Sequence, residues 1–206
     1  QISAMSAVAE YLTITQTNAM PLVRPPVIEG QASVMQIDTA TRRSLELAQG
    51  ADGGKAGSLL ATIDRTVTAG GARLLERRLS SPSCTLSTIA QRQDSVTYFA
   101  NNSRVAGDLR DTLRGVHDLD RALSRLVLER GGPRDMAAIR NTIAQAVTLH
   151  TMLPDDMPGA LSPARTALLG HDDLLALLDE ALVAEAPLLA RDGGFIAPGY
   201  DDELDE

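Results

Sequence analysis

The sequence predicts an all-α fold, an irregular multi-helix bundle with one or two short extended segments. Apolar residues recur at the three- and four-residue spacing of helices along most of the 206 residues. The apolar fraction is 44%, but it includes only two Phe, three Tyr and no Trp. The core must therefore be built from Leu, Ala, Val and Ile, which suits helix-on-helix packing. A chain of this length forms one domain, or one and a fraction.

The first predicted helix covers residues 2–15, and its apolar side chains share one face. These side chains are Met5, Val8, Ala9 and Leu12. Three prolines then forbid regular helix and predict a linker between two bodies. They are Pro21, Pro25 and Pro26. A short extended run over residues 34–37 follows. We therefore divide the chain into a first segment at 1–20, a linker with the extended run at 21–37, and a helical core domain at 38–206.

Short polar residues predict the starts of the next helices. Asp38 or Thr39 caps a helix that continues through Ala48, and Ser58 caps a short helix that carries Leu59, Leu60 and Ile63. Thr68 caps a helix from Ala69 to Leu79, and a further helix covers residues 85–101. A flexible glycine-rich loop separates the first two of these helices. Its glycines are Gly50, Gly53, Gly54 and Gly57.

The second half of the chain continues the helical pattern. A helix from His117 to Leu128 carries a stripe at i, i+4 and i+7, formed by Leu119, Leu123 and Leu126. Pro133 suits the first position of a helix that continues to about Leu153. The apolar stripe of that helix contains Met136, Ile139, Ile143 and Val147. Prolines at 154, 158 and 163 predict a loose connection to a Leu-rich helix over 171–185, and a turn with a short extended piece covers 191–199. We expect eight or nine helices in total.

The last residues, 199–206, have the pattern of a helix start. Asp201, Asp202 and Glu203 place carboxylates where the helix dipole favours them, and Leu204 opens an apolar stripe. No glycine, basic turn or proline then ends the helix. We expect this chain to be a piece of a longer one.

Composition restricts the possible classes of function. The net charge is −8, and residues 42–134 hold 15 basic against 10 acidic side chains, whereas 135–206 hold 3 against 14. The basic excess is too small for a dedicated nucleic-acid binder. A single cysteine, Cys84, excludes an internal disulfide and suggests a reducing compartment. No run approaches the roughly eighteen apolar residues of a membrane span, and no secretory signal appears, so we expect a cytoplasmic protein without membrane contact.

No residue pattern predicts catalysis, a cofactor or a metal. The loop from Gly50 to Ser58 fails as a phosphate loop because Lys55 is followed by Ala56 and not by Ser or Thr. His117 and His171 each lie beside carboxylates, but adjacent residues of a helix do not face one another. Cys84 is expected to be a small, half-buried side chain.

Four further polar or charged residues have structural explanations. Capping or ion pairing explains Asp38, Asp64 and Asp94, and His150 lies near a helix end where a cation is favourable. Catalytic, cofactor-binding and metal-binding residues are therefore predicted to be none.

Several stretches occur in a characteristic order and spacing. They are residues 38–47, residues 58–75 and residues 191–206, with weaker pieces at 118–126 and 133–136 between them. Together these stretches resemble the core region of the MutS family of bacterial DNA mismatch repair proteins. The resemblance covers the chain from about residue 5 to its end.

The resemblance implies a MutS-type core fold and a role in DNA repair. Proteins of this family are dimers with a mismatch-recognition domain, a connector, a helical core with lever arms, a clamp and an ATPase domain. This chain resembles the end of the connector, through about Met20, and the first part of the core up to the start of a lever helix. ATP, Mg, mismatched double-stranded DNA and the second subunit would then bind to other domains of the parent protein. The mismatch-reading Phe-x-Glu motif and the Walker-type ATPase motif do not occur in this sequence.

The resemblance favours a core fragment that couples domains, has no activity alone and binds DNA weakly or not at all. Two alternatives stay open. One is a free-standing helical module for protein–protein interaction. The other is a small helical enzyme that uses the carboxylates beside His117 or His171.

Overall fold

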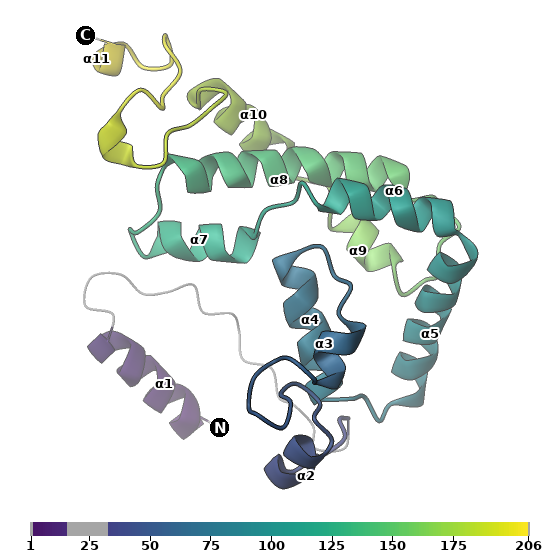
Figure 1. Ribbon diagram of the computed structural model, residues 1–206. Coiled ribbons are helices and arrows are strands. Elements are labelled where there is room, and N and C mark those ends of the chain that lie inside the picture. Colours follow the sequence, from purple (N-terminus) through teal and green to yellow (C-terminus); the bar gives the residue numbers. More distant parts are fainter. Residues whose placement is uncertain (1, 16–32, 206) are drawn as a thin grey trace. The chain divides into compact units, whose positions relative to one another are not determined.

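The computed structural model describes residues 2–15 and 33–205, and this part of the chain is all-α (Figure 1). The first six helices are α1 (Ile2–Thr15), α2 (Thr39–Ser44), α3 (Leu59–Ile63), α4 (Ala69–Ser80), α5 (Leu86–Asn101) and α6 (Ser103–Leu113). The others are α7 (Leu119–Val127), α8 (Pro133–Met152), α9 (Ser162–Thr166), α10 (Asp172–Ala181), the 3-10 turn η1 (Ala190–Asp192) and α11 (Asp202–Asp205). The predicted fold class is confirmed. Residues 21–32 of the predicted linker and extended segment at 21–37 lie outside the described residues.

The helix count differs from the prediction of eight or nine, because the described residues contain eleven α-helices. The sequence interpretation missed α6 and the short α9. Helix α6 had a readable signal, since Val105, Leu109 and Leu113 repeat every four residues and are all half-buried. Gly107 and a high density of charge conceal that pattern.

The chain divides into two compact units. The described residues of the first unit are 2–15, 117–144 and 171–205, and those of the second are 33–116 and 145–170. The division falls inside α8, between Ala144 and Gln145, so this helix supplies residues to both units.

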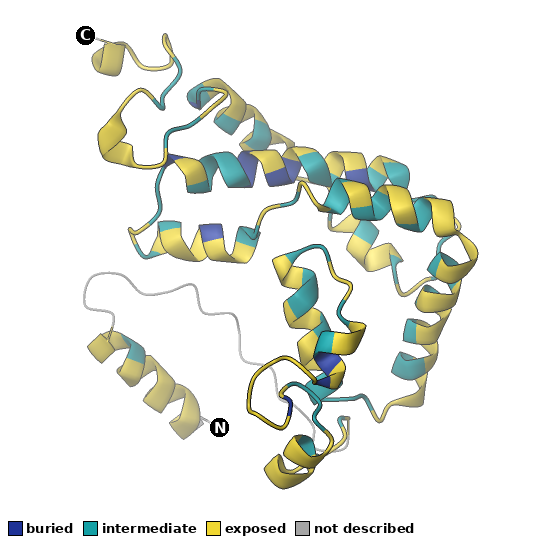
Figure 2. Ribbon diagram, viewed as in Figure 1, coloured by how far each residue is buried: buried dark blue, intermediate teal, exposed yellow. Residues whose placement is uncertain are grey.

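The core of the first unit lies where α7, α8 and α10 meet. Its buried residues are Ala122, Ile139 and Ile143, and the half-buried Leu119, Leu126, Leu175 and Leu178 pack against them. Figure 2 shows buried residues on both α7 and α8.

One member of the predicted stripe of α7 is not part of this core. Leu123 is 36% exposed, whereas its neighbour Ala122 is 4% exposed. Ala122 lies three residues after Leu119 and four before Leu126, so it occupies the centre of their shared face. Leu123 is turned by one residue, about 100°, toward solvent. Val147 in α8, also predicted for a core stripe, is likewise 36% exposed.

Helix α10 ends earlier than the predicted residue 185, because the chain changes to extended backbone. Leu182 forms an antiparallel bridge with Ile196, and the Val183 N–H donates to the Phe195 carbonyl over 3.1 Å. The return to Ile196 requires a turn at Gly193 and Gly194, whose φ angles are 66° and 63°. Glycine adopts such angles at no steric cost because it lacks a Cβ, and the predicted turn is confirmed.

In the second unit, α2 also ends earlier than predicted, at Ser44 instead of Ala48. Glu46 has a φ of 49°, which breaks the helix. The carbonyls of Glu46 and Leu47 then accept the N–H groups of Leu59 and Leu60 over 2.8 and 2.9 Å. These bonds satisfy two N–H groups at the start of α3 that no intrahelical acceptor can reach.

Candidate functional site

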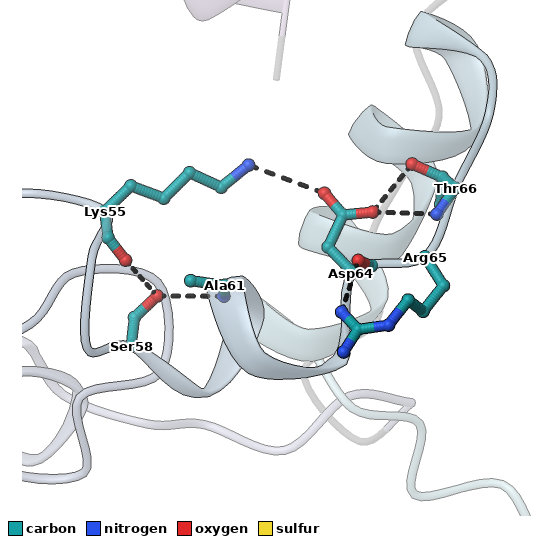
Figure 3. Close-up of polar contacts among 6 residues, drawn as sticks. All are labelled: Lys55, Ser58, Ala61, Asp64, Arg65 and Thr66. Carbon is teal, nitrogen blue, oxygen red and sulfur yellow. Dashed lines mark hydrogen bonds and ion pairs between the residues drawn. The ribbon is translucent and has the colours of Figure 1, made fainter.

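The α3–α4 junction, which we define as residues 55–68, is a region of the second unit with several polar side-chain bonds. Ser58 is 0% exposed at the start of α3. Its hydroxyl accepts the Ala61 N–H over 3.1 Å and donates to the Lys55 carbonyl over 2.7 Å (Figure 3). Ser58 therefore caps the helix as predicted, and it also fixes the end of the glycine-rich loop to that helix.

Asp64 closes the other end of α3. Its carboxylate accepts the Thr66 hydroxyl over 2.7 Å and the Thr66 N–H over 3.0 Å, and Lys55 Nζ lies 3.5 Å away (Figure 3). The hydrogen bonds from the Thr66 hydroxyl and N–H lower the pKa of Asp64 from its ordinary value. The carboxylate is thus held in its charged form, where it shapes the turn between α3 and α4.

Two arginines bond the backbone of this turn. Arg65 Nη1 donates to the Asp64 carbonyl over 3.0 Å, and Arg110 Nη1 of α6 donates to the Arg65 carbonyl over 2.7 Å. The second bond joins residues 45 positions apart in the chain. Hydrogen bonds therefore join the α3–α4 junction to α6 as well as to the end of the glycine-rich loop.

Three glycine N–H groups of the glycine-rich loop are already hydrogen-bonded and cannot bind a phosphate as a phosphate loop does. The N–H groups of Gly50, Gly53 and Gly54 donate to acceptors inside the loop, over 2.8 to 3.0 Å. A Cβ at Gly50 would lie 2.3 Å from the Ala56 carbonyl oxygen, so the tight loop itself requires glycine there. Lys55 reaches toward Asp64 instead of into the loop (Figure 3).

In the first unit, Arg140 of α8 is a buried charged side chain with several polar contacts, and it is 8% exposed. Its guanidinium donates to the carbonyls of Val183 over 3.1 Å and Ala184 over 2.9 Å, with Leu182 at 3.5 Å. Its Nε lies 3.6 Å from the Asp179 carboxylate of α10. Arg140 therefore binds the extended segment that follows α10 to the middle of α8.

The sequence interpretation missed Arg140, although a signal was present. Arg140 lies four residues after Met136 and three before Ile143, which places it on the apolar face of α8. A charged residue at such a position is buried only when it finds partners. That expectation could have singled out Arg140 among the arginines of the chain.

The histidines considered for chemistry have separate surroundings. His117 and His171 are exposed, and His171 precedes α10, whose first turn holds Asp172 and Asp173. His150 is half-buried near the end of α8, where its Nδ1 lies 3.1 Å from the Arg165 carbonyl. Among the described residues, no group of three or more His, Cys, Asp and Glu side chains has the arrangement of a metal site.

The outcomes for Cys84 and the capping aspartates differ. Cys84 is free and exposed, so the prediction of a half-buried thiol is wrong. Asp38 caps α2 by accepting the Thr41 N–H over 2.9 Å and its hydroxyl over 2.7 Å, and these bonds lower the pKa of Asp38.

Within residues 2–15 and 33–205, no helix has the length and apolar character needed to cross a membrane.

The fold and these contacts define a class of protein segment, an all-α scaffold whose buried polar side chains bond one backbone segment to another. The family model for MutS domain III matches residues 40–205. The chain therefore belongs to the MutS family.

Curated relatives match the whole chain and carry the name DNA mismatch repair protein MutS. The proteins from Paracoccus denitrificans and Cereibacter sphaeroides are 58% and 56% identical over 206 residues, and that from Ruegeria pomeroyi is 56% identical over 207. In each case 100% of this chain is covered, and it spans about 24% of the length of the relative.

Proposed function

We propose that this chain is the core segment of a MutS-type DNA mismatch repair protein, which links and couples the parts that recognise DNA and use ATP. The observation that carries the proposal is the match of the entire chain to about a quarter of relatives named DNA mismatch repair protein MutS. In this proposal, mismatched double-stranded DNA, a second subunit, ATP and Mg bind to other parts of the protein. The protein works in the cytoplasm, and this segment alone neither hydrolyses ATP nor binds a mismatch.

The bonding of the described residues supports a role in transmitting movement. A segment that couples domains must move as a stiff body, because coupling needs elements with discrete arrangements. Arg140 and Arg110 each bond backbone carbonyls far away in sequence. Such bonds stiffen the connections between helices, where a bundle would otherwise bend.

A chimera tests the proposed function. The corresponding segment of the Paracoccus denitrificans relative is replaced by this chain, and the chimera is expressed in a strain that lacks its own MutS. We expect the spontaneous mutation frequency to return to the level obtained with the intact relative. A chimera that is folded and present at normal levels but leaves the mutation frequency high would refute the proposal.

The isolated chain provides a second test, with DNA and ATP as ligands. We expect no ATP hydrolysis and only weak, salt-sensitive binding to duplex DNA, without preference for a mismatch. ATP turnover, or nanomolar binding to a mismatched duplex at physiological salt, would show that this segment has an activity of its own.

A further inference from the structure

Two arginines of the second unit lie close together without a carboxylate to neutralise them. Arg78 of α4 and Arg92 of α5 both line the same two hollows, which have volumes of about 740 and 630 Å³. Within residues 2–15 and 33–205, neither guanidinium has a hydrogen bond or an ion pair, in contrast to Arg110 and Arg140. Placing two like charges together costs free energy unless a counter-charge joins them.

The other polar groups around these arginines are neutral. Ser83 and Thr97 line one hollow, and Thr88 and Ser95 line the other. No Asp or Glu is among the described residues that line either hollow. Every polar side chain at this place can therefore donate a hydrogen bond, which is what an oxyanion requires.

The position of Arg92 shows why helix electrostatics do not explain the pair. Arg78 lies near the end of α4, where the helix dipole favours a cation. Arg92 lies in the middle of α5, far from either end, and it is half-buried. Partial burial and the charge of Arg92 lower the pKa of Arg78. The two charges therefore disfavour one another in the free protein.

We infer that Arg78 and Arg92 form a binding site for a phosphate group. Two guanidinium forks that approach from different helices suit a tetrahedral phosphate, which offers acceptor oxygens in several directions. A carboxylate has only two coplanar oxygens and is satisfied by one fork. The phosphate belongs either to a small phosphate monoester or to the backbone of a nucleic acid. This inference does not rest on the proposed function.

The test uses the full 206-residue chain and inorganic phosphate, titrated in a calorimeter at constant ionic strength with chloride as the balancing anion. We expect wild type to bind phosphate, and Arg78→Gln and Arg92→Gln each to weaken the binding at least tenfold. Arg104→Gln is the matched control, because it removes the same charge from a side chain that is 95% exposed, and it should leave the affinity within twofold of wild type.

A second arm distinguishes the source of the phosphate. If the site takes the nucleic-acid backbone, a short DNA duplex displaces inorganic phosphate. Each Gln variant then reduces the slope of log K for DNA binding against log salt concentration by about one. If the site takes a monoester, the duplex does not compete. Either result supports a phosphate site.

Three results would overturn the inference. One is the absence of phosphate binding by wild type, and another is equal binding by wild type and the folded double variant. The third is binding of a Glu-rich peptide that is lost in both Gln variants, with no binding of inorganic phosphate to wild type. Arg78→Lys and Arg92→Lys control for loss of folding in the Gln variants. They keep the positive charge and should bind phosphate with intermediate affinity.

Discussion

Arg140 donates a hydrogen bond of 2.9 Å to the carbonyl oxygen of Ala184, which lies 44 residues later in the chain. The same guanidinium donates to the Val183 carbonyl. Both carbonyls follow the end of α10, where no helical N–H can reach them. A buried arginine thus takes the place of a regular secondary-structure partner and determines where the extended segment lies on α8.

Replacing Arg140 should destabilise the first unit. Arg140→Met keeps most of the side-chain volume but leaves at least two carbonyls without a donor. We expect the free energy of unfolding to fall by about 2–3 kcal/mol, since each lost bond costs about 1 kcal/mol or more. Urea denaturation measures this change. Arg134→Met, at an exposed site on the same helix, should change the stability by less than about 0.5 kcal/mol, and equal losses in both variants would contradict the role of Arg140.

The core of the first unit predicts a contrast between two aliphatic residues. Ile143→Ala should lower the free energy of unfolding by about 2–5 kcal/mol, because Ile143 is buried in the core cluster and its truncation leaves a cavity. Leu123→Ala should cost less than about 1 kcal/mol, because Leu123 is already partly solvated. Chemical denaturation of both variants checks the contrast. A larger loss at Leu123 would mean that α7 presents another face to the core.

The buried cap of α3 predicts a local effect. Ser58→Ala removes the acceptor for the Ala61 N–H and should cost about 1–2 kcal/mol in the free energy of unfolding. Ser87→Ala, at an exposed position in the first turn of α5, is the control and should be nearly neutral. Amide hydrogen exchange at Ala61 gives an independent readout, because this N–H should exchange faster in the Ser58 variant only.

The α3–α4 junction predicts a dependence of stability on acid. Because the folded-state pKa of Asp64 is lower than its ordinary value of 3.8, the charged carboxylate stabilises the folded state above that value. The contribution is lost as the pH falls through the lower, folded-state pKa. Wild type should therefore be more stable than Asp64→Asn near neutral pH, and the difference should shrink on acidification below pH 3.8.

Urea denaturation across a series of pH values measures this difference. The control is Asp156→Asn, at an exposed position whose carboxylate makes no hydrogen bond or ion pair with the described residues. It should change the free energy of unfolding by less than about 0.5 kcal/mol near neutral pH. A difference for Asp64→Asn that stayed constant through the acid range would refute the assignment.

Features determined by neighbouring residues were predicted well from the sequence. Ser58 and Thr68 cap the helices assigned to them, and Pro133 begins α8. Asp38, one of two candidates, caps α2. These predictions succeed because a cap is a hydrogen bond between residues three positions apart. Its geometry therefore depends only on neighbouring residues.

The ends of α2 and α10 were predicted less well. Both helices end before their local pattern does, because the chain leaves the helix to bond distant backbone. Leu47 accepts a hydrogen bond from Leu60, and Leu182 forms a bridge with Ile196. Helix propensity is a weak preference, and such tertiary bonds override it.

The sequence by itself determined the helical class, the helix starts and the resemblance to the MutS core, because periodicity, caps and motif order are local properties of the chain. Only the tertiary structure decided which side chains are buried. Ala122 and not Leu123 lies in the core. Arg140 donates hydrogen bonds to three backbone carbonyls. Arg78 and Arg92 line hollows in which no described residue is a carboxylate. Burial and pairing depend on residues far apart in sequence, and the local pattern of one helix does not specify them.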